Sequence, residues 1–209
     1  MTASRGPSAW YMLGALGAVV VVAAALGVAQ SPSGADQARS DLVSAATATL
    51  HAAGYTEHYL GTSSQGVEEL ELTYQAPDRL SGYRLVAGRR SYLAVAGSTL
   101  YQATSVSTTG GTAGLRFATQ PYAPASRVDP VQQDLSYALR ATAVARTGDV
   151  YSFDVRLGAG AVAHFRVRVD GQYATALTAQ APGGALGLTV TDINAAPPAF
   201  VPPASSLVG

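Results

Sequence analysis

The sequence predicts an α+β fold in which a strongly curved antiparallel β-sheet, or half-barrel, carries helices on its concave face, preceded by one N-terminal transmembrane helix. Three observations predict this fold. Residues 9–29 form an unbroken apolar run, two later segments repeat apolar residues at helical spacing, and many short segments alternate apolar with polar residues. Alternating segments at even spacing are typical of an antiparallel meander with one face in water. We expect the aliphatic face of the sheet to cup the helices.

The apolar run at residues 9–29 is long enough to cross a membrane. As a helix it would cover about 31 Å, which matches the hydrocarbon core of a bilayer. No charged residue interrupts the chain between Arg5 and Asp36. Arg5 gives a weak positive-inside bias and Trp10 suits the cytoplasmic interface, so residues 1–8 are predicted to be a cytoplasmic tail.

Cleavage is the alternative fate of this segment. Gly27 and Ala29 are small residues at the spacing of a signal peptidase site, and cleavage after Ala29 would release a secreted protein. The length of the apolar core favours an uncleaved signal anchor. We therefore expect a single-pass plasma-membrane protein, in which residues 30–35 form a linker and a domain at residues 36–195 lies outside the cytoplasm.

The composition narrows the function classes. The chain has no cysteine, so neither a disulfide nor a lipidated cysteine holds the exported domain. Its 13 acidic and 13 basic residues balance, and no basic field argues for a nucleic-acid partner. All the basic residues are arginine and alanine is abundant, which is typical of a GC-rich coding sequence. The domain is long enough to bury a core without covalent staples.

The first half of the domain is predicted to be one amphipathic helix followed by a meander. The helix covers residues 36–53, where apolar residues from Leu42 to Leu50 recur at helical spacing, Ser33 is placed to cap the start and Gly54 to end it. Alternation then takes over. Strands are predicted at residues 55–62, 67–75, 80–86, 91–95, 99–104 and 114–118.

A loop at residues 120–128, which contains two prolines, precedes a second helix. Asp129 is the expected N-cap, Pro130 occupies the first helical position, and Gln132 completes a capping box. Gly148 lies beyond the end of this helix. The predicted apolar stripe consists of Val131, Leu135, Ala138, Leu139 and Thr142.

A second meander closes the domain. Asp170-Gly171 lies between two alternating runs and predicts a type I′ hairpin turn, which needs positive φ at both central positions. The proline-rich tail at residues 196–209 is not expected to form a regular ladder. The strands of this meander are predicted at residues 151–157, 161–169, 172–180 and 185–193.

Short stretches of the domain resemble a known family. Residues 72–80 (LTYQAPDRL), residues 88–92, residues 97–101 and the closing residues 189–194 (TVTDIN) resemble the lipoprotein-carrier fold of LolA and of the actinobacterial LppX and LprG lipoproteins. The resemblance implies a half-barrel that accommodates a lipid or another apolar molecule, in lipid or lipoprotein handling at the cell envelope. The chain departs from the lipoproteins in having no cysteine to lipidate, so the apolar span would replace the acyl anchor. Such a tethered protein would extract, hold or hand over a lipid locally.

An apolar concave face explains how such a ligand would bind. Each methylene of an acyl chain moved from water into an apolar cavity contributes about 0.8 kcal/mol. If the protein's own side chains fill the cavity instead, the domain is an envelope protein-interaction or sensor module. Arg89, Arg90 and Tyr122 are assigned to the rim, where arginine suits lipid phosphates. The predicted wall residues are Leu70, Leu72, Tyr74, Phe153, Val155, Phe165 and Val167.

No pattern in the chain announces catalysis or a metal. The histidines His51, His58 and His164 lack metal-ligand spacing, and no serine lies in GxSxG or SxxK. An envelope hydrolase is therefore the least supported function, and we expect no catalytic residue, no metal and no cofactor. The acidic cluster Glu68, Glu69 and Glu71 is interpreted as a solvated face of a strand. Tyr74, Tyr83, Tyr92 and Tyr101, which recur every nine residues, are interpreted as sheet and rim packing.

Overall fold

The computed structural model describes residues 32–64, 66–105, 112–123, 129–157 and 160–208. The predicted transmembrane anchor, the cytoplasmic tail and the cleavage site at Ala29 lie outside the described residues. Among the helices that are described, none has the length and apolar character needed to cross a bilayer.

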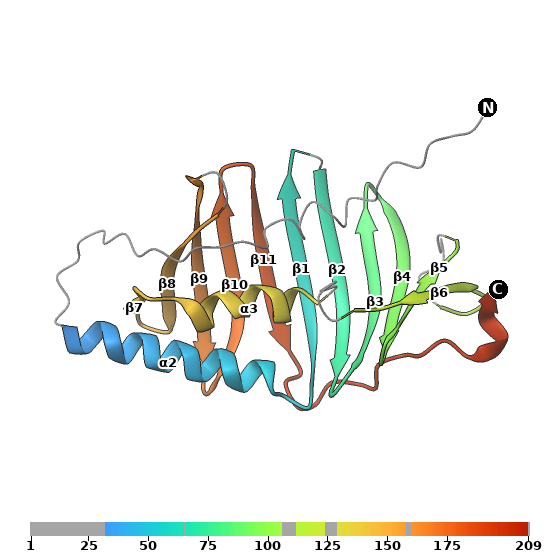
Figure 1. The fold of residues 1–209 in the computed structure, drawn as a ribbon, viewed down its shortest axis with the longest axis horizontal. Coiled ribbons are helices and arrows are strands. Elements are labelled where there is room, and N and C mark those ends of the chain that lie inside the picture. Colours follow the sequence, from blue (N-terminus) through green and yellow to red (C-terminus); the bar gives the residue numbers. More distant parts are fainter. Residues whose placement is uncertain (1–31, 65, 106–111, 124–128, 158–159, 209) are drawn as a thin grey trace.

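A single twelve-stranded sheet forms the body of the domain (Figure 1). Its spatial order is β12-β6-β5-β4-β3-β2-β1-β11-β10-β9-β8-β7. The two predicted meanders are confirmed, and they meet where β1 pairs with β11. The first comprises β1 (Gly54–Ser63), β2 (Gly66–Gln75), β3 (Arg79–Val86), β4 (Arg89–Ala96), β5 (Thr99–Ala103) and β6 (Phe117–Pro121). The second comprises β7 (Ala145–Thr147), β8 (Val150–Arg156), β9 (Val162–Asp170), β10 (Tyr173–Ala181) and β11 (Gly184–Thr191), and β12 (Leu207–Val208) ends the chain.

Two helices lie on one face of the curved sheet, as predicted, and we call this the inner face (Figure 1). The helix α2 (Pro32–Leu50) contacts β10 and β7, whereas α3 (Pro130–Arg140) contacts β11, and the helices pack against each other. A short 3₁₀ helix, η3 (Ala204–Ser206), precedes β12. In the described residues, the predicted α+β class and the sheet covered by helices are therefore confirmed.

Strand alternation decides which side chains enter the core. On β8 and β9 the residues at every second position, such as Phe153 and Phe165, are buried, while Asp154 and His164 between them are exposed. The inner-face residues of both meanders join the apolar residues of α2 and α3 in one main core. This alternation is confirmed.

A second, smaller core lies on the outer face of the first meander. Tyr92, Leu115 and Phe117 are buried there, and Tyr83 and Tyr101 pack against them. The C-terminal segment covers this core, since the ring of Phe200 lies 6.0 Å from that of Phe117. The prediction that the tail forms no ladder is wrong, because β12 pairs in parallel with β6. The pairing uses residues beyond the prolines, whose missing N–H groups would have interrupted it.

Several predicted boundaries shift. The first helix starts at Pro32, so residues 32–35 belong to the helix instead of a linker, and Ser33 lies inside it; proline is tolerated in a first helical turn because its N–H is not needed there. The helix ends at Leu50. The strand predicted at residues 114–118 is β6, Phe117–Pro121, so Gln120 belongs to a strand and not to the loop.

The second helix also departs from its prediction. Asp129 caps it as expected, accepting from the Gln132 N–H at 3.0 Å. The Gln132 side chain does not close a capping box; it donates to the Leu50 carbonyl and the Tyr55 hydroxyl. The helix ends at Arg140, so Thr142 lies outside it and is exposed.

The predicted hairpin exists, but its turn is one residue later. Asp170 pairs with Tyr173, which leaves Gly171 and Gln172 as the two loop residues. Gly171 has φ of +58°, and it is the only one of the two with positive φ. Glycine with positive φ at the first central position is the type II′ arrangement, not type I′.

Candidate functional site: the inner face and the groove beside α2

The predicted wall residues do come together on the inner face. Six of the seven, all except Tyr74, have exposed fractions of 4 % or less. Tyr74 is partly buried and its ring stacks on that of Tyr55 at 4.8 Å. From α3, Tyr137 reaches Phe165 with 5.2 Å between ring centroids. These side chains form a packed layer beneath the helices, so a ligand reaches them only if a helix moves.

The predicted rim residues do not form one rim. Arg89 and Arg90 begin β4, and Arg90 lies over the ring of Tyr83, 4.0 Å from its centroid, on the outer face. Alternation places Arg90 in phase with Tyr92, opposite to the inner-face residues of the same strand. Tyr122 packs against the main core, and its N–H donates to the Ser98 carbonyl at 2.7 Å. The structure thus places Arg90 on the face of the sheet that points away from the helices.

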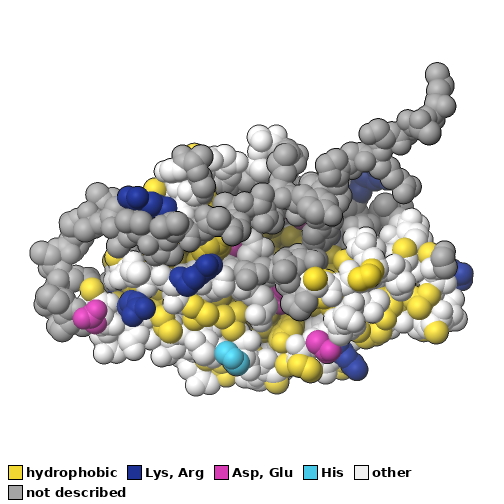
Figure 2. Space-filling view, viewed as in Figure 1, with side chains coloured by type: hydrophobic (Ala, Val, Ile, Leu, Met, Phe, Trp, Pro, Cys, Tyr) yellow, Lys and Arg dark blue, Asp and Glu magenta, His cyan; other side chains and the backbone are white. Residues whose placement is uncertain are grey.

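A groove runs between α2 and the ends of the second meander. Its volume is about 610 Å³, within the range of small-molecule sites. The buried side chains of Ala45 and Tyr151 contribute to it, so its floor is the edge of the main core. In the view of Figure 2, hydrophobic side chains gather over the region that Figure 1 shows as α2 and the neighbouring sheet, with charged ones scattered among them. The groove is lined by Asp41, Ser44, Ala45 and Ala48 of α2 and by Arg146, Gly148, Asp149, Tyr151, Val169, Gly171 and Gln172.

An ion pair bridges the groove near the N-terminal half of α2. The Arg146 guanidinium donates to Asp41 at 3.0 Å, and both side chains are partly exposed. Arg146 also donates to the Gly148 carbonyl and lies 5.2 Å from the centre of the Tyr151 ring. Ion pairs of this exposure contribute at most about 1 kcal/mol. The contact therefore closes the groove weakly.

The C-terminal end of α2 is fixed more firmly. Strand β10 changes register between Ala174 and Ala176, which is a β-bulge. The buried Thr49 hydroxyl accepts from the Ala174 N–H at 2.9 Å and donates to the Ala45 carbonyl at 3.1 Å. A bulge leaves a ladder group without a strand partner, and Thr49 satisfies it. α2 is thus held at its C-terminal end by buried hydrogen bonds, whereas its N-terminal half is held by the exposed ion pair and by the burial of Ala38 and Leu42 in the main core.

Three buried carboxyl groups lie where α3 meets the sheet. The sequence identified one of them, Asp129, only as a helix cap and did not indicate the other two. Glu57 on β1, Asp129 at the start of α3 and Asp134 within it have exposed fractions of 0 %, 6 % and 5 %. Burial, with the nearby charge of Asp129, raises the pKa of Glu57 well above its ordinary value. Burial and Asp129 raise the pKa of Asp134 to about 7. The sequence signal for the burial of Glu57 was its position in the strand. It lies two residues from both Tyr55 and Tyr59, so all three side chains point to the inner face of β1.

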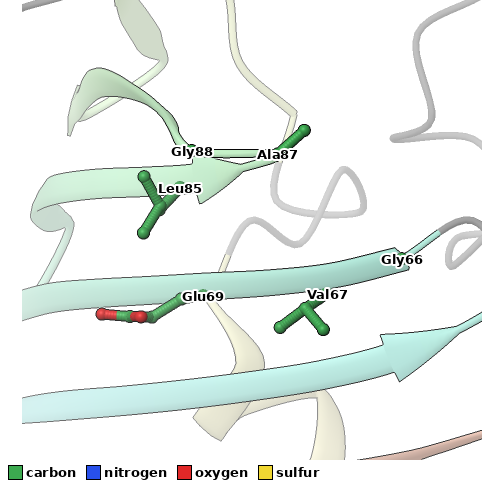
Figure 3. Close-up of a pocket in the computed structure, with 6 residues that line it drawn as sticks. All are labelled: Gly66, Val67, Glu69, Leu85, Ala87 and Gly88. Atoms are coloured by element: carbon green, nitrogen blue, oxygen red, sulfur yellow. The ribbon is translucent and has the colours of Figure 1, made fainter.

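A smaller hollow of about 220 Å³ lies at the tips of the β1–β2 and β3–β4 hairpins. Figure 3 shows Val67, Glu69 and Leu85 projecting from β2 and β3 beside the turn that contains Ala87 and Gly88. Val67 is 56 % exposed. None of the predicted wall residues lines this hollow.

The other predicted polar residues have ordinary partners. His58 lies 3.5 Å from Glu69, and His164 lies 2.6 Å from Asp154. In the described segments no three His, Cys, Asp or Glu side chains form a group that would hold a metal ion. The acidic cluster divides between two faces: Glu68 pairs with Arg84 on the inner face, whereas Glu71 accepts from the Tyr83 hydroxyl on the outer face.

Comparison with known proteins finds similarity in fold only. No protein-family model matches the chain, and no curated protein does. LprF from Mycobacterium bovis is 9 % identical, with 80 % of this chain and 97 % of that one covered, at a TM-score of 0.45. The Mycobacterium tuberculosis lipoprotein LppX is 12 % identical, with 76 % of this chain and 96 % of that one covered, at a TM-score of 0.43. A LolA-superfamily protein from Nitrosomonas europaea is 9 % identical, with 76 % of this chain and 93 % of that one covered, at a TM-score of 0.38. The chain is thus similar to proteins of the LolA-like and LppX-like fold.

Proposed function

We propose that this domain binds a lipid or another apolar molecule in the groove beside α2, without catalysis, in lipid or lipoprotein handling at the cell envelope. The observation that supports the proposal best is the groove itself, whose floor is the apolar edge of the main core. Contact with Ala45, Tyr151 and Val169 would remove apolar ligand surface from water, and burial of this kind needs no directed chemistry.

The attachment of α2 supports a route for longer ligands. The helix is pinned at Thr49, whereas its N-terminal half is held across the groove by the exposed Asp41–Arg146 pair. Arg39 adds a hydrogen bond of 2.8 Å to the Ala141 carbonyl. If these two contacts open and Ala38 and Leu42 leave the main core, α2 swings about its C-terminal end. An acyl chain then extends from the groove toward the inner-face layer that contains Tyr151 and Val167.

The membrane placement belongs to the same proposal. If residues 9–29 are an uncleaved anchor, only a few residues separate the span from Pro32, where α2 begins. An extended chain covers at most about 3.6 Å per residue, so α2 would start close to the bilayer surface. The loosely held end of α2 would then face the membrane that supplies the ligand.

The second candidate is a protein-interaction or sensor module with a filled core. The burial of six predicted wall residues favours it, because they pack against the protein's own helices. The two candidates differ in whether α2 moves to admit a ligand.

Filling the groove tests the proposal. Ala48 lines the groove on α2, whereas Thr47 is exposed and does not line it. With a fluorescent fatty acid as probe, we expect Ala48→Trp to weaken binding at least about tenfold and Thr47→Trp to leave it unchanged. If the unaltered domain takes up no probe, or if Ala48→Trp binds as well as the control, the groove is not the binding site.

A further inference from the structure

The proposed binding function makes no use of the buried carboxyl groups beneath α3. Glu57 projects from the inner face of β1, the strand that joins the two meanders, and meets Asp129 at the start of α3. Asp134 lies one turn further along the helix. Burying three acidic groups together is costly unless hydrogen bonds or protons compensate for the lost hydration.

The hydrogen bonds leave one acceptor unsatisfied. The Val131 N–H donates to Glu57 Oε2 at 3.0 Å. Asp129 accepts from the Gln132 N–H at 3.0 Å and from the Tyr55 hydroxyl at 2.8 Å. Glu57 Oε1 is fully buried and has no donor among the described residues.

The carboxyl groups of Glu57 and Asp129 accept from successive N–H groups of α3, those of Val131 and Gln132, so they lie side by side. Ionised carboxylates only accept hydrogen bonds and repel each other, whereas a protonated carboxyl group donates one. A proton on Glu57 Oε1 turns the unsatisfied acceptor into a donor and removes one negative charge from the cluster. The arrangement is therefore complete when Glu57 is protonated.

The surroundings favour the protonated form. Strand β11 presents the aliphatic Val190 opposite Glu57. On α2, Arg39 hydrogen-bonds at the far end of α3, to the Ala141 carbonyl. The titratable and charged groups around the cluster are Tyr55 and Tyr59 on β1, Tyr74 on β2, Asp134 on α3, and the Glu68–Arg84 pair of β2 and β3, which acts on Tyr59.

We propose that Glu57, Asp129 and Asp134 form a proton-binding site that holds α3 on the inner face, and that loss of the protons releases the helix. With protons bound, the carboxyl groups link β1 to the first turn of α3 through hydrogen bonds. Without them, three negative charges face one another out of water and drive the start of α3 away from the sheet. Control of ligand uptake by this site rests on the proposed function, whereas proton binding itself does not.

The direction of the pH dependence follows from the raised pKa values. A carboxyl group whose pKa is higher in the folded protein stabilises the fold below its ordinary pKa, and this stabilisation is lost as the pH rises through the folded value. For Asp134 the loss runs from its ordinary value of 3.8 up to about pH 7, where it is nearly complete. The start of α3 is therefore docked in mild acid and released in mild base.

Spin labels on the full chain in detergent micelles test the site. Because the chain has no cysteine, Gln133→Cys on α3 and Thr73→Cys on β2 give one labelled pair. We expect a narrow distance distribution at pH 5 that broadens at pH 8.5. Glu57→Gln keeps the shape and hydrogen-bonding capacity without the charge, so it should reduce the broadening. Asp154→Asn, a change at an exposed contact with His164 outside the groove, should leave the transition as in the unaltered chain.

The outcomes separate the site from the proposed function. An unchanged distribution between pH 5 and pH 8.5, or an undiminished transition in Glu57→Gln, would overturn the proton site. If Glu57→Gln does not fold, Asp134→Asn takes its place and should reduce the broadening in the same way; undiminished broadening would overturn the proposal. Probe uptake is measured on the same samples. Movement of α3 without uptake at any pH supports the proton site and contradicts the proposed function.

Discussion

The two helices cover the same face of one sheet but are held in different ways. α2 presents mostly small buried side chains, including Ala38, Ala45 and Ala46, and its N-terminal half is fastened by an exposed ion pair. α3 buries the larger Leu135 and Tyr137, and the N–H groups of its first turn donate to the buried carboxyl groups of Glu57 and Asp129. The polar contacts of α2 are therefore mostly exposed, whereas those of α3 depend on the charge state of buried groups.

Cross-linking α2 to the sheet should have the largest effect. The variant Asp41→Cys/Arg146→Cys, joined by a reducible bis-maleimide, ties the loose end of α2 across the groove. We expect probe uptake to be abolished and to return on reduction, because reduction frees the helix again. The control pair Asp154→Cys/His164→Cys joins β8 to β9 without touching α2 and should bind normally. Normal uptake by the cross-linked α2 variant would show that the helix need not move.

Neutralising Asp134 should change how stability depends on pH. Burial and the charge of Asp129 raise the pKa of Asp134 to about 7, and each unit of raised pKa is worth about 1.4 kcal/mol. The unaltered domain should therefore lose unfolding free energy between pH 5 and pH 8, and Asp134→Asn should lose less. Urea unfolding at both pH values measures this. Parallel losses in the two proteins would mean that Asp134 does not titrate in this range.

The fixed end of α2 should depend on one hydroxyl. Thr49→Val keeps the side-chain shape but leaves the Ala174 N–H at the bulge without an acceptor. An unsatisfied buried donor costs about 1–3 kcal/mol, which urea unfolding should detect. Thr47→Val, at an exposed position of the same helix, is expected to stay within about 0.5 kcal/mol. Equal effects at the two positions would remove the role assigned to the Thr49 hydroxyl.

Opening the ion pair should have the smallest effect on stability. Asp41→Asn weakens the contact with Arg146 and should cost less than about 1 kcal/mol, because both groups are partly exposed. The same change should speed probe uptake, since the contact closes the groove. Stopped-flow fluorescence measures the rate, with Asp154→Asn as the control. A slower or unchanged rate in Asp41→Asn would show that the pair does not restrain α2.

Local chemistry made parts of the fold predictable. The alternation around Phe153 and Phe165 indicates two strands with one face in water, and Asp129-Pro130 indicates the start of a helix. Both signals depend only on residues that are neighbours in the sequence. The pairing of β12 with β6 is set by contacts far apart in the sequence, so a two-residue strand carries no local signal.

The candidate site was less predictable for a related reason. Alternation placed the wall residues on the correct face, but it does not say whether helices fill the space in front of them. The groove combines α2 with residues such as Tyr151 and Gln172, which are distant in sequence and meet only in the fold. Glu57 was recognisable by its phase alone, and its burial depends on where α3 docks.

We propose that α2 covers a binding groove for an apolar molecule. Mass spectrometry of organic extracts tests this most directly, with the domain at residues 32–209 purified after expression with its anchor and release from the membrane. We expect a lipid in near-stoichiometric amount with the unaltered protein and a several-fold smaller amount with Ala48→Trp. Extracts that contain no stoichiometric lipid, or the same amount from both proteins, would contradict it.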